Sequence, residues 1–144
     1  FVNFLADVYG VDAAERQERL AYLQSVFALG DSIYNEISSY SHGMKQKLAV
    51  ISALIHAPKL LIMDEPFVGL DPKAAHTLKT IMRELCDNGG AIFFSTHVLE
   101  VAEKLCDKIA IIREGKLVIA GDTETVRGDT SLENVFLELV EDEQ

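Results

Sequence analysis

The sequence predicts an α/β fold, in which a small parallel sheet with flanking helices follows a purely helical front. Two short apolar runs, Leu60–Met63 and Ala91–Ser95, have the length and continuity of strands that are buried on both faces. A helix is predicted between them, and a strand–helix–strand unit favours parallel pairing. Before residue 58 only helical spacing is found.

The front is predicted to contain three helices. Helical spacing of apolar residues predicts the first helix over residues 1–9. Asp12 is expected to cap the second, which ends near Gly30, with Glu15 as its capping-box partner. After a polar connection, the third helix is expected over residues 43–57.

The second half alternates strands and helices. Asp71 and Pro72 are predicted as the N-cap and first residue of a long helix that ends near Cys86. The later expected elements are a helix at Val98–Cys106, a hairpin of Ile109–Arg113 with Lys116–Ala120, a helical turn at Thr123–Arg127, a helix at Leu132–Val140 and an acidic tail.

Composition narrows the class of protein. The chain has 144 residues, enough for one globular domain with a core. Its net charge of −10, from 13 Lys and Arg against 23 Asp and Glu, disfavours binding to nucleic acid or anionic lipid. No apolar run approaches the roughly 20 residues that span a bilayer. Two cysteines, Cys86 and Cys106, lack metal-like spacing and are expected to be reduced and buried, as in a cytosolic protein.

An acid pair follows the first predicted strand. Asp64 and Glu65 lie at its carboxyl end, where open α/β sheets bind their ligands, and Pro66 helps to end the strand. Two adjacent carboxylates there suggest a metal ligand beside a base that activates water. On this stretch alone, two ordinary surface acids remain an equal alternative.

Three further segments carry candidate site residues. Ser41, Gly43 and their neighbours begin a helix, whose unpaired N–H groups can bind phosphate, although an ordinary serine cap has the same pattern. Asp71 is expected near the active end of the strand, and a simple N-cap is the alternative. His97 follows the second strand and is expected at the same sheet edge as Glu65, where a structural role is the alternative.

The acid pair and the three further segments, taken in their order along the chain, resemble the motifs of the nucleotide-binding subunits of ABC transporters. The resemblance spans nearly the whole chain. Tyr40–Lys47 resembles a variant of the LSGGQ signature, in a form similar to bacterial ABC-2-type exporters. Leu60–Glu65 resembles the Walker B strand with its glutamate, Val68–Asp71 resembles the D-loop, and His97 matches the switch histidine.

The resemblance implies a RecA-like P-loop NTPase core that uses ATP and Mg²⁺. Residues 1–57 would be the helical subdomain, which ends in the signature and its helix, and residues 58–144 the C-terminal part of the core. The roles that it implies are Mg²⁺ binding by Asp64, positioning of the attacking water by Glu65, contact of His97 with the γ-phosphate, coupling of two subunits by Asp71, and contacts of Ser41, His42, Gly43 and Met44 with ATP on the other subunit.

The chain departs from the family pattern in two ways. Tyr40, His42 and Met44 replace the leucine, first glycine and glutamine of the signature. No G-x-x-x-x-G-K-[ST] sequence occurs, so we expect the second half of an ATPase, without the P-loop strand. Alone it is expected neither to hydrolyse ATP nor to bind it tightly. The gap left in the sheet is expected to be filled by a homodimer or another rearrangement.

The resemblance also implies partners. They are a membrane permease subunit and a second ATP-binding subunit, with no nucleic acid and no membrane span in this chain. The protein would then be cytoplasmic and peripheral at the inner face of the cell membrane. A soluble ABC-family ATPase of DNA repair or translation, and an interaction module without catalysis, are the alternatives.

Overall fold

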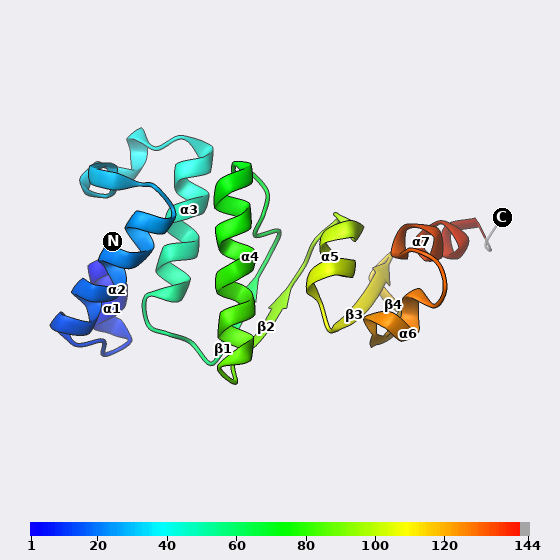
Figure 1. Ribbon diagram of the computed structural model, residues 1–144. Coiled ribbons are helices and arrows are strands. Elements are labelled where there is room, and N and C mark those ends of the chain that lie inside the picture. Colours follow the sequence, from blue (N-terminus) through cyan, green and yellow to red (C-terminus); the bar gives the residue numbers. More distant parts are fainter. Residues whose placement is uncertain (142–144) are drawn as a thin grey trace. The chain divides into compact units, whose positions relative to one another are not determined.

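The computed structural model describes residues 1–141 and forms two compact units, residues 1–95 and the residues from Thr96 on (Figure 1). Most of the expected acidic tail, residues 142–144, lies outside the described residues. The expected subdomain boundary after residue 57 stays a prediction.

The first unit contains the helical front and the parallel strands. Its helices and strands are α1 Val2–Val8, α2 Ala13–Val26, two short 3₁₀ helices at Gly30–Tyr34 and Ile37–Ser39, α3 His42–Leu54, β1 Leu60–Met63, α4 Pro72–Asp87 and β2 Ala91–Phe94. The α/β fold with a small parallel sheet is therefore confirmed. The two 3₁₀ helices occupy the polar connection between α2 and α3.

Asp12 caps α2 as predicted. Its carboxylate accepts hydrogen bonds from the N–H groups of Ala14 and Glu15 at 2.9 and 3.0 Å. The expected return bond from Glu15 is wrong, because the Glu15 side chain pairs with Arg19 one turn further along the helix. An i, i+4 ion pair on the helix surface has replaced the capping box.

The sheet of the first unit has two strands. β1 and β2 pair in parallel, with Leu61 opposite Ile92 and Ile62 opposite Phe93. Burial of the strands on both faces is wrong: Leu61 is buried, but Leu60 and Ile62 are 57% and 68% exposed. Successive side chains of a strand point to opposite faces, and α4 packs against β2, so one face is covered and the other is open.

The core of this unit lies between the helices and the covered face of the sheet. α4 contributes Ala74, Leu78 and Met82, which recur at helical spacing and are at most 3% exposed. α3 contributes Ile51, and Ile55 follows at its C-cap; both are fully buried. This packing fixes the start of α3 and the loop before α4, where the candidate site residues lie.

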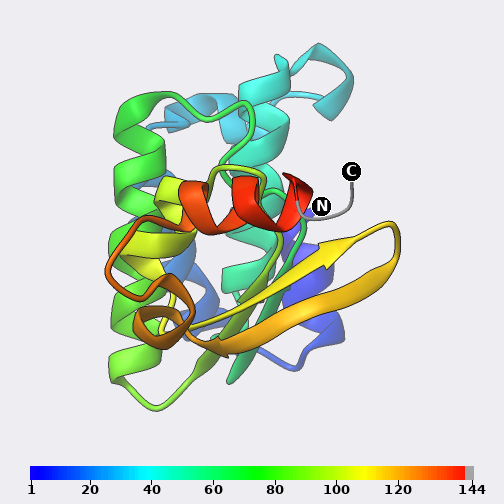
Figure 2. The ribbon, with the colours of Figure 1, turned by 90° about the vertical axis from the view of Figure 1, so that its right-hand side faces the viewer.

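The second unit is an antiparallel hairpin with three helices. Its elements are α5 Leu99–Leu105, β3 Lys108–Arg113, β4 Lys116–Asp122, α6 Thr123–Arg127 and α7 Leu132–Glu141. Figure 2 shows the long hairpin with α6 at one end. Glu114 and Gly115 have φ of 50° and 76°, the left-handed pair that two-residue hairpin turns require. The predicted hairpin is confirmed, with longer strands.

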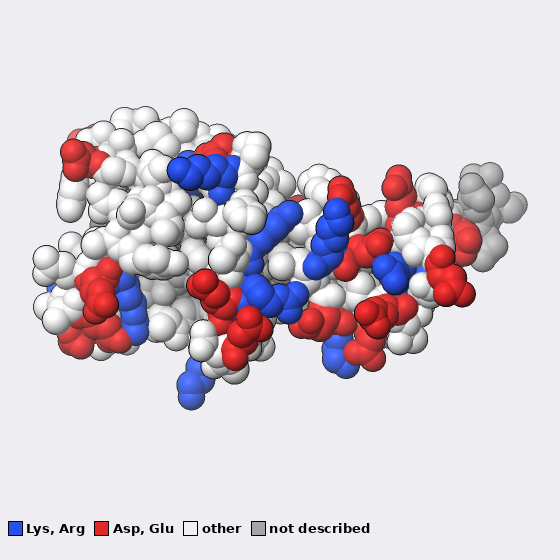
Figure 3. Space-filling view, in the orientation of Figure 1, with Lys and Arg blue, Asp and Glu red and all other residues white. Residues whose placement is uncertain are grey.

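Acidic side chains predominate over this unit in Figure 3, and basic side chains lie among them. Lys104 pairs with Glu100 within α5 at 2.6 Å, whereas Lys108 with Asp122 joins β3 to β4 at 3.2 Å and Arg127 with Glu103 joins α6 to α5 at 3.6 Å. Glu103 also accepts a hydrogen bond from the N–H of Leu132 at 2.9 Å, which joins α5 to the start of α7. Positive charge is thus locally compensated by neighbouring carboxylates.

Two expectations from composition have simple outcomes. Cys86 and Cys106 are free thiols, but both are half-buried rather than buried. Among the described residues, no helix combines the length and the apolar character that crossing a membrane requires.

Candidate functional site

The acid pair lies at the carboxyl end of β1, held from the neighbouring strand. The hydroxyl of Ser95 donates to Oδ1 of Asp64, and the N–H of Glu65 donates to Oγ of Ser95 at 3.0 Å. The N–H of Ser95 in turn donates to the carbonyl of Met63 at 3.0 Å. Parallel pairing of Met63 with Phe94 brings the next residues of both strands together, so one serine holds the carboxylate of Asp64 and the backbone of Glu65.

Glu65 has an unusual backbone conformation. Its φ of 45° lies in the left-handed region, which costs free energy for residues other than glycine and occurs both in tight turns and at active sites. The carbonyl of Glu65 accepts from the N–H of Val68 at 3.1 Å, and Pro66 is fully buried. The chain therefore turns sharply at Glu65, and its backbone is fixed on both sides.

The segment that resembles the signature begins α3. Ser41 is its N-cap, and its Oγ accepts a hydrogen bond from the N–H of Met44 at 3.2 Å. The serine cap, which the sequence left open as the alternative, is present, and phosphate binding by Ser41 stays a prediction. Because the hydroxyl accepts there, its proton remains available for donation to a ligand. The serine can thus cap the helix and bind phosphate at the same time.

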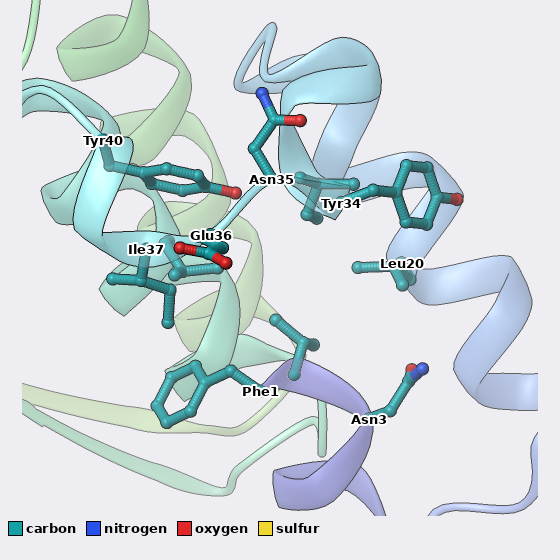
Figure 4. Close-up of a pocket in the computed structure, with 11 residues that line it drawn as sticks. Phe1, Asn3, Leu20, Tyr34, Asn35, Glu36, Ile37 and Tyr40 are labelled. Carbon is teal, nitrogen blue, oxygen red and sulfur yellow. The ribbon is translucent and has the colours of Figure 1, made fainter.

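Tyr40 anchors this segment from behind. Its ring is 5% exposed, and its hydroxyl donates to the carbonyl of Ser32 at 2.7 Å. The ring forms part of the wall of a hollow of about 360 Å³, to which Tyr34 and Ile37 also contribute (Figure 4). Where the family carries leucine, this chain has a tyrosine that ties the start of α3 to the 3₁₀ helices.

Two glycines bring α3 against the loop of residues 66–71, which we call the 66–71 loop. A Cβ atom on Gly43 would lie 2.8 Å from the carbonyl oxygen of Gly69, and one on Gly69 would lie 2.5 Å from Cδ2 of His42. Only glycine permits these approaches without displacement. Gly43 is therefore needed for packing within the chain, and the ring of His42 lies against the loop.

Asp71 ends the 66–71 loop and caps α4, as predicted. Its Oδ1 accepts from the N–H of Ala74 at 2.9 Å, and its Oδ2 pairs with Nζ of Lys47 at 2.7 Å. The hydrogen bond from Lys47, followed by that from Ala74, lowers the pKa of Asp71 below its usual value. The carboxylate is thus ionised and oriented at neutral pH.

His97 lies in the second unit, three residues beyond the end of β2. The N–H of Val98 donates to Oγ1 of Thr96 at 3.1 Å, which turns the chain before α5 begins. The expected position of His97 beside Glu65 stays a prediction, because the two residues belong to different units.

Three residues of this arrangement were not predicted. Ser95 was expected to be only the end of a strand, yet it bridges the two acids. Gln46 donates from Nε2 to the carbonyl of Pro66 at 3.2 Å, and Lys47 pairs with Asp71. The spacing of residues 42, 46 and 47 places them on neighbouring positions of one helix face, which was the available signal.

The oxygen donors at this site suit a magnesium ion that is held mainly by the phosphate oxygens of a bound molecule and by water. No cluster of three or more His, Cys, Asp or Glu side chains that could hold a metal is found within residues 1–141. Mg²⁺ prefers oxygen ligands, keeps several waters and is commonly bound by one or two carboxylates together with phosphate oxygens. The exposed Asp64 carboxylate fits that chemistry, whereas a metal site built from this chain alone does not.

Comparison with known proteins connects this arrangement to a family. A model of the family described as "AAA domain, putative AbiEii toxin, Type IV TA system" matches residues 11–103. The chain is 35% identical over 136 residues to the ABC transporter ATP-binding protein YxlF of Bacillus subtilis, an alignment that covers 94% of this chain and 45% of YxlF. For EcsA, an ABC-type transporter ATP-binding protein of the same organism, the identity is 33% over 147 residues, with 99% and 60% covered.

Solved structures give the same result. The structure of an ATP-binding subunit of an ABC transporter superposes with a TM-score of 0.92 at 35% identity, covering 97% of this chain and 60% of that one. A dimeric ATP-binding cassette with bound ADP and phosphate has a TM-score of 0.66 at 21% identity, over 78% of this chain and 49% of that one, and supports the fold alone. The chain spans about half the length of the curated relatives that it matches.

Proposed function

Because this chain belongs to the ABC transporter ATP-binding proteins, we propose that it is part of the ATP-hydrolysing subunit of a transporter. The observation that carries the proposal is the Ser95 bridge, which holds the carboxylate of Asp64 and the backbone of Glu65 side by side at the carboxyl end of β1. Two acids of different roles need such fixed positions, because proton transfer and metal binding both depend on geometry.

The two acids would divide the chemistry between them. Asp64 would hold Mg²⁺, which neutralises charge on the transferred phosphoryl group when it is bound. Glu65 would position the attacking water and take its proton. The sharp turn at Glu65 supports this assignment, since it fixes the backbone from which the carboxylate extends.

The remaining site residues would bind phosphate and join subunits. The start of α3, with Ser41, His42, Gly43 and Met44, would face the γ-phosphate of ATP on a second subunit, because helix N-termini favour anions. Asp71 would couple the two subunits, and its fixed orientation through Lys47 supports that role. His97 would contact the γ-phosphate from the end of the second strand.

The loop that binds the phosphates of ATP would come from another segment. The 144 residues contain no G-x-x-x-x-G-K-[ST] sequence, and that loop supplies the backbone cradle, the lysine and the hydroxyl for Mg²⁺. We therefore propose that residues 1–57 are the helical subdomain, that residues 58–144 are the C-terminal part of the core, and that this chain alone neither hydrolyses ATP nor binds it tightly.

A membrane permease would be the second partner, reached through the helical front. Tyr34 and Ile37 are 78% and 40% exposed there, beside the hollow of Figure 4. Exposed apolar groups around a hollow are suited to a protein partner. The protein would then act at the cytoplasmic face of the cell membrane.

Reconstitution tests the proposed function. The chain is mixed with a separately purified N-terminal segment of an ABC-type ATP-binding protein, chosen because its sequence contains G-x-x-x-x-G-K-[ST], and ATP hydrolysis is measured. We expect activity only in the mixture, and Glu65→Gln should lower it by about 10²–10⁴-fold while ATP binding is kept. Glu114→Gln, in the exposed hairpin turn, is the matched control.

Three results would contradict the proposal. Turnover at the wild-type rate by Glu65→Gln would remove Glu65 from its role. Micromolar affinity for Mg-ATP by the chain alone, measured by isothermal titration, would contradict the division of the ATP site between two segments. Failure of every N-terminal segment to restore hydrolysis would favour a non-catalytic interaction module.

A further inference from the structure

We propose that one face of α3 holds the 66–71 loop in place, so that the phosphate-facing start of α3 and the carboxylate of Asp71 move as one body. Lys47 and His42 are the positioning residues of this clamp, which we call the α3 clamp. The contacts of the α3 clamp do not depend on the proposed function, but the consequence of the clamp for ATP hydrolysis rests on that function.

The α3 clamp contacts the loop at its start, middle and end. Gln46 donates to the carbonyl of Pro66 at 3.2 Å, the ring of His42 lies against Gly69, and Lys47 pairs with Asp71 at 2.7 Å. Residues four apart on a helix lie on one face, so His42 and Gln46 align, and Lys47 lies beside them. Contacts at three points fix a six-residue loop in position as well as in orientation.

The ion pair at the end of the loop is well placed to resist motion. The Lys47 side chain is only 14% exposed, whereas that of Asp71 is 51% exposed. A lysine with its stem buried against the helix has few other positions for its ammonium group. Movement of Asp71 away from α3 would therefore leave a largely buried cation without this partner, which is unfavourable.

The middle contact is steric and is made by the ring of His42. Gly69 has φ of 80°, and a Cβ there would lie 2.7 Å from Nε2 of His42 as well as 2.5 Å from Cδ2. His42 stands where the family signature has glycine, so the larger side chain and the bare backbone of Gly69 fit together in this chain. On the other side, a Cβ on Gly43 would lie 2.8 Å from the backbone oxygen of Gly69, so the helix start and the loop also approach closely through backbone atoms.

The consequence is a link between two parts of the proposed site. A phosphate that binds at Ser41–Met44 would pull on α3, and the clamp would carry the displacement to Asp71. In the proposed ATPase, occupancy of one nucleotide site would then be reported to the residue that couples the subunits.

Hydrogen exchange on the 144-residue chain tests the α3 clamp directly. The amides of Val68 and Leu70 donate to the carbonyls of Glu65 and Phe67 at 3.1 and 3.3 Å, so they report opening of the loop. We expect them to exchange about tenfold faster in Lys47→Met, while Lys47→Arg, which keeps the charge, stays near wild type. Lys45→Met, an exposed lysine of the same helix, is the matched control.

A second variant pair tests the steric contact. Gly69→Ala should speed exchange of the same two amides, and part of that effect should disappear when it is combined with His42→Ala, because the ring that the new methyl group meets has been removed. A double-mutant cycle measures the difference. Unchanged exchange in Lys47→Met, or strictly additive effects of Gly69→Ala and His42→Ala, would overturn the clamp.

The reconstituted ATPase separates the clamp from the proposed function. There Lys47→Met should lower kcat with little change in KM for ATP, and Lys47→Arg should restore kcat. If the mixture shows no hydrolysis at all, the proposed function fails, and the exchange rates still decide whether α3 holds the loop. A loss of kcat that Lys47→Arg does not restore would refute the positioning role of the charge.

Discussion

At the scale of single residues, Ser95 contacts both acids of the candidate site. Its hydroxyl both donates to Asp64 and accepts from the backbone of Glu65. We expect Ser95→Ala to lower the free energy of unfolding by about 1 kcal/mol, since it removes two hydrogen bonds, one of them to a carboxylate, from a solvent-accessible position. Urea denaturation gives the value.

The matched control for Ser95→Ala is Ser38→Ala. The hydroxyl of Ser38 also donates to a carboxylate, that of Glu36 at 3.2 Å, but on an exposed 3₁₀ helix where it joins no strands. Its unfolding free energy should stay within about 0.5 kcal/mol of wild type. Equal losses of unfolding free energy in both variants would show that the Ser95 bridge contributes no more to stability than an exposed surface hydrogen bond.

His56 gives the first unit a dependence on pH. Its ring stacks on that of Tyr9 with 3.9 Å between centroids, and its Nδ1 is buried without a hydrogen-bond partner among the described atoms. Burial, and then the nearby Arg19, lower the pKa of His56 below its usual 6.5. Arg19 itself donates to the carbonyl of Ile55 and pairs with Glu15, so it remains beside the ring.

The sign of that dependence follows from linkage. The fold favours the neutral imidazole, so its contribution to stability is complete above the usual pKa and is lost as the pH falls through the lower pKa of the folded state. We expect His56→Phe, which keeps a stacking ring, to lose less stability than wild type between about pH 7 and about pH 5. Denaturant midpoints across that range measure it, and parallel curves would contradict the assignment.

Residue roles differ in how far the sequence predicts them. The positions of Asp64 and Glu65 at a strand end followed from an apolar run that stops at two acids. The bridge by Ser95 needs the register of β1 with β2, which no single run contains. The contact of His42 with Gly69 needs the packing of α3 on a loop, and a glycine in a sequence does not say what it faces.

At the scale of elements, α4 depends on its N-cap. Asp71 accepts from the N–H of Ala74, whereas Asp122, the N-cap of α6, makes no such side-chain bond. Asp71→Ala should therefore lower the denaturation midpoint clearly, and Asp122→Ala should change it little, although both remove an exposed aspartate at a helix start. Thermal unfolding followed by circular dichroism compares them, and equal midpoints would contradict the capping role.

The pairing of Asp71 with Lys47 also makes the stability of the fold depend on pH in the acid range. The folded state lowers the pKa of Asp71, mainly through the hydrogen bond from Lys47, so it favours the carboxylate. That stability is present above the unfolded pKa and is lost as the pH falls through the folded one. The difference between wild type and Asp71→Ala should shrink from about pH 6 to about pH 3.

Helices with clear end signals were predicted best. Asp71 with Pro72, and Ser41 before an apolar stripe, gave the starts of α4 and α3 to within a residue or two. The two 3₁₀ helices lack such signals, because they are too short for a period to appear. The burial of β1 was overestimated, since apolar composition states what a strand could bury and not whether a layer covers it.

At the scale of the whole molecule, the first unit has an apolar face that α4 does not cover. Ile62 and Phe93 lie opposite each other on adjacent strands, and both are more than 60% exposed. Leu60 extends the same face. In a sheet of only two strands, both edges and one face are open to association, and a homodimer or another rearrangement was expected from the sequence for a related reason.

Self-association through this face is the corresponding prediction. The apparent mass of the chain in sedimentation should rise with concentration, and the double variant Ile62→Thr, Phe93→Thr should suppress that rise, because threonine keeps strand propensity while removing apolar area. Tyr34→Thr, which removes a side chain that is 78% exposed on a 3₁₀ helix, is the control and should associate like wild type. If the double variant associates as strongly as the control, the open face of β1 and β2 does not drive assembly, and the edges of the strands become the remaining route.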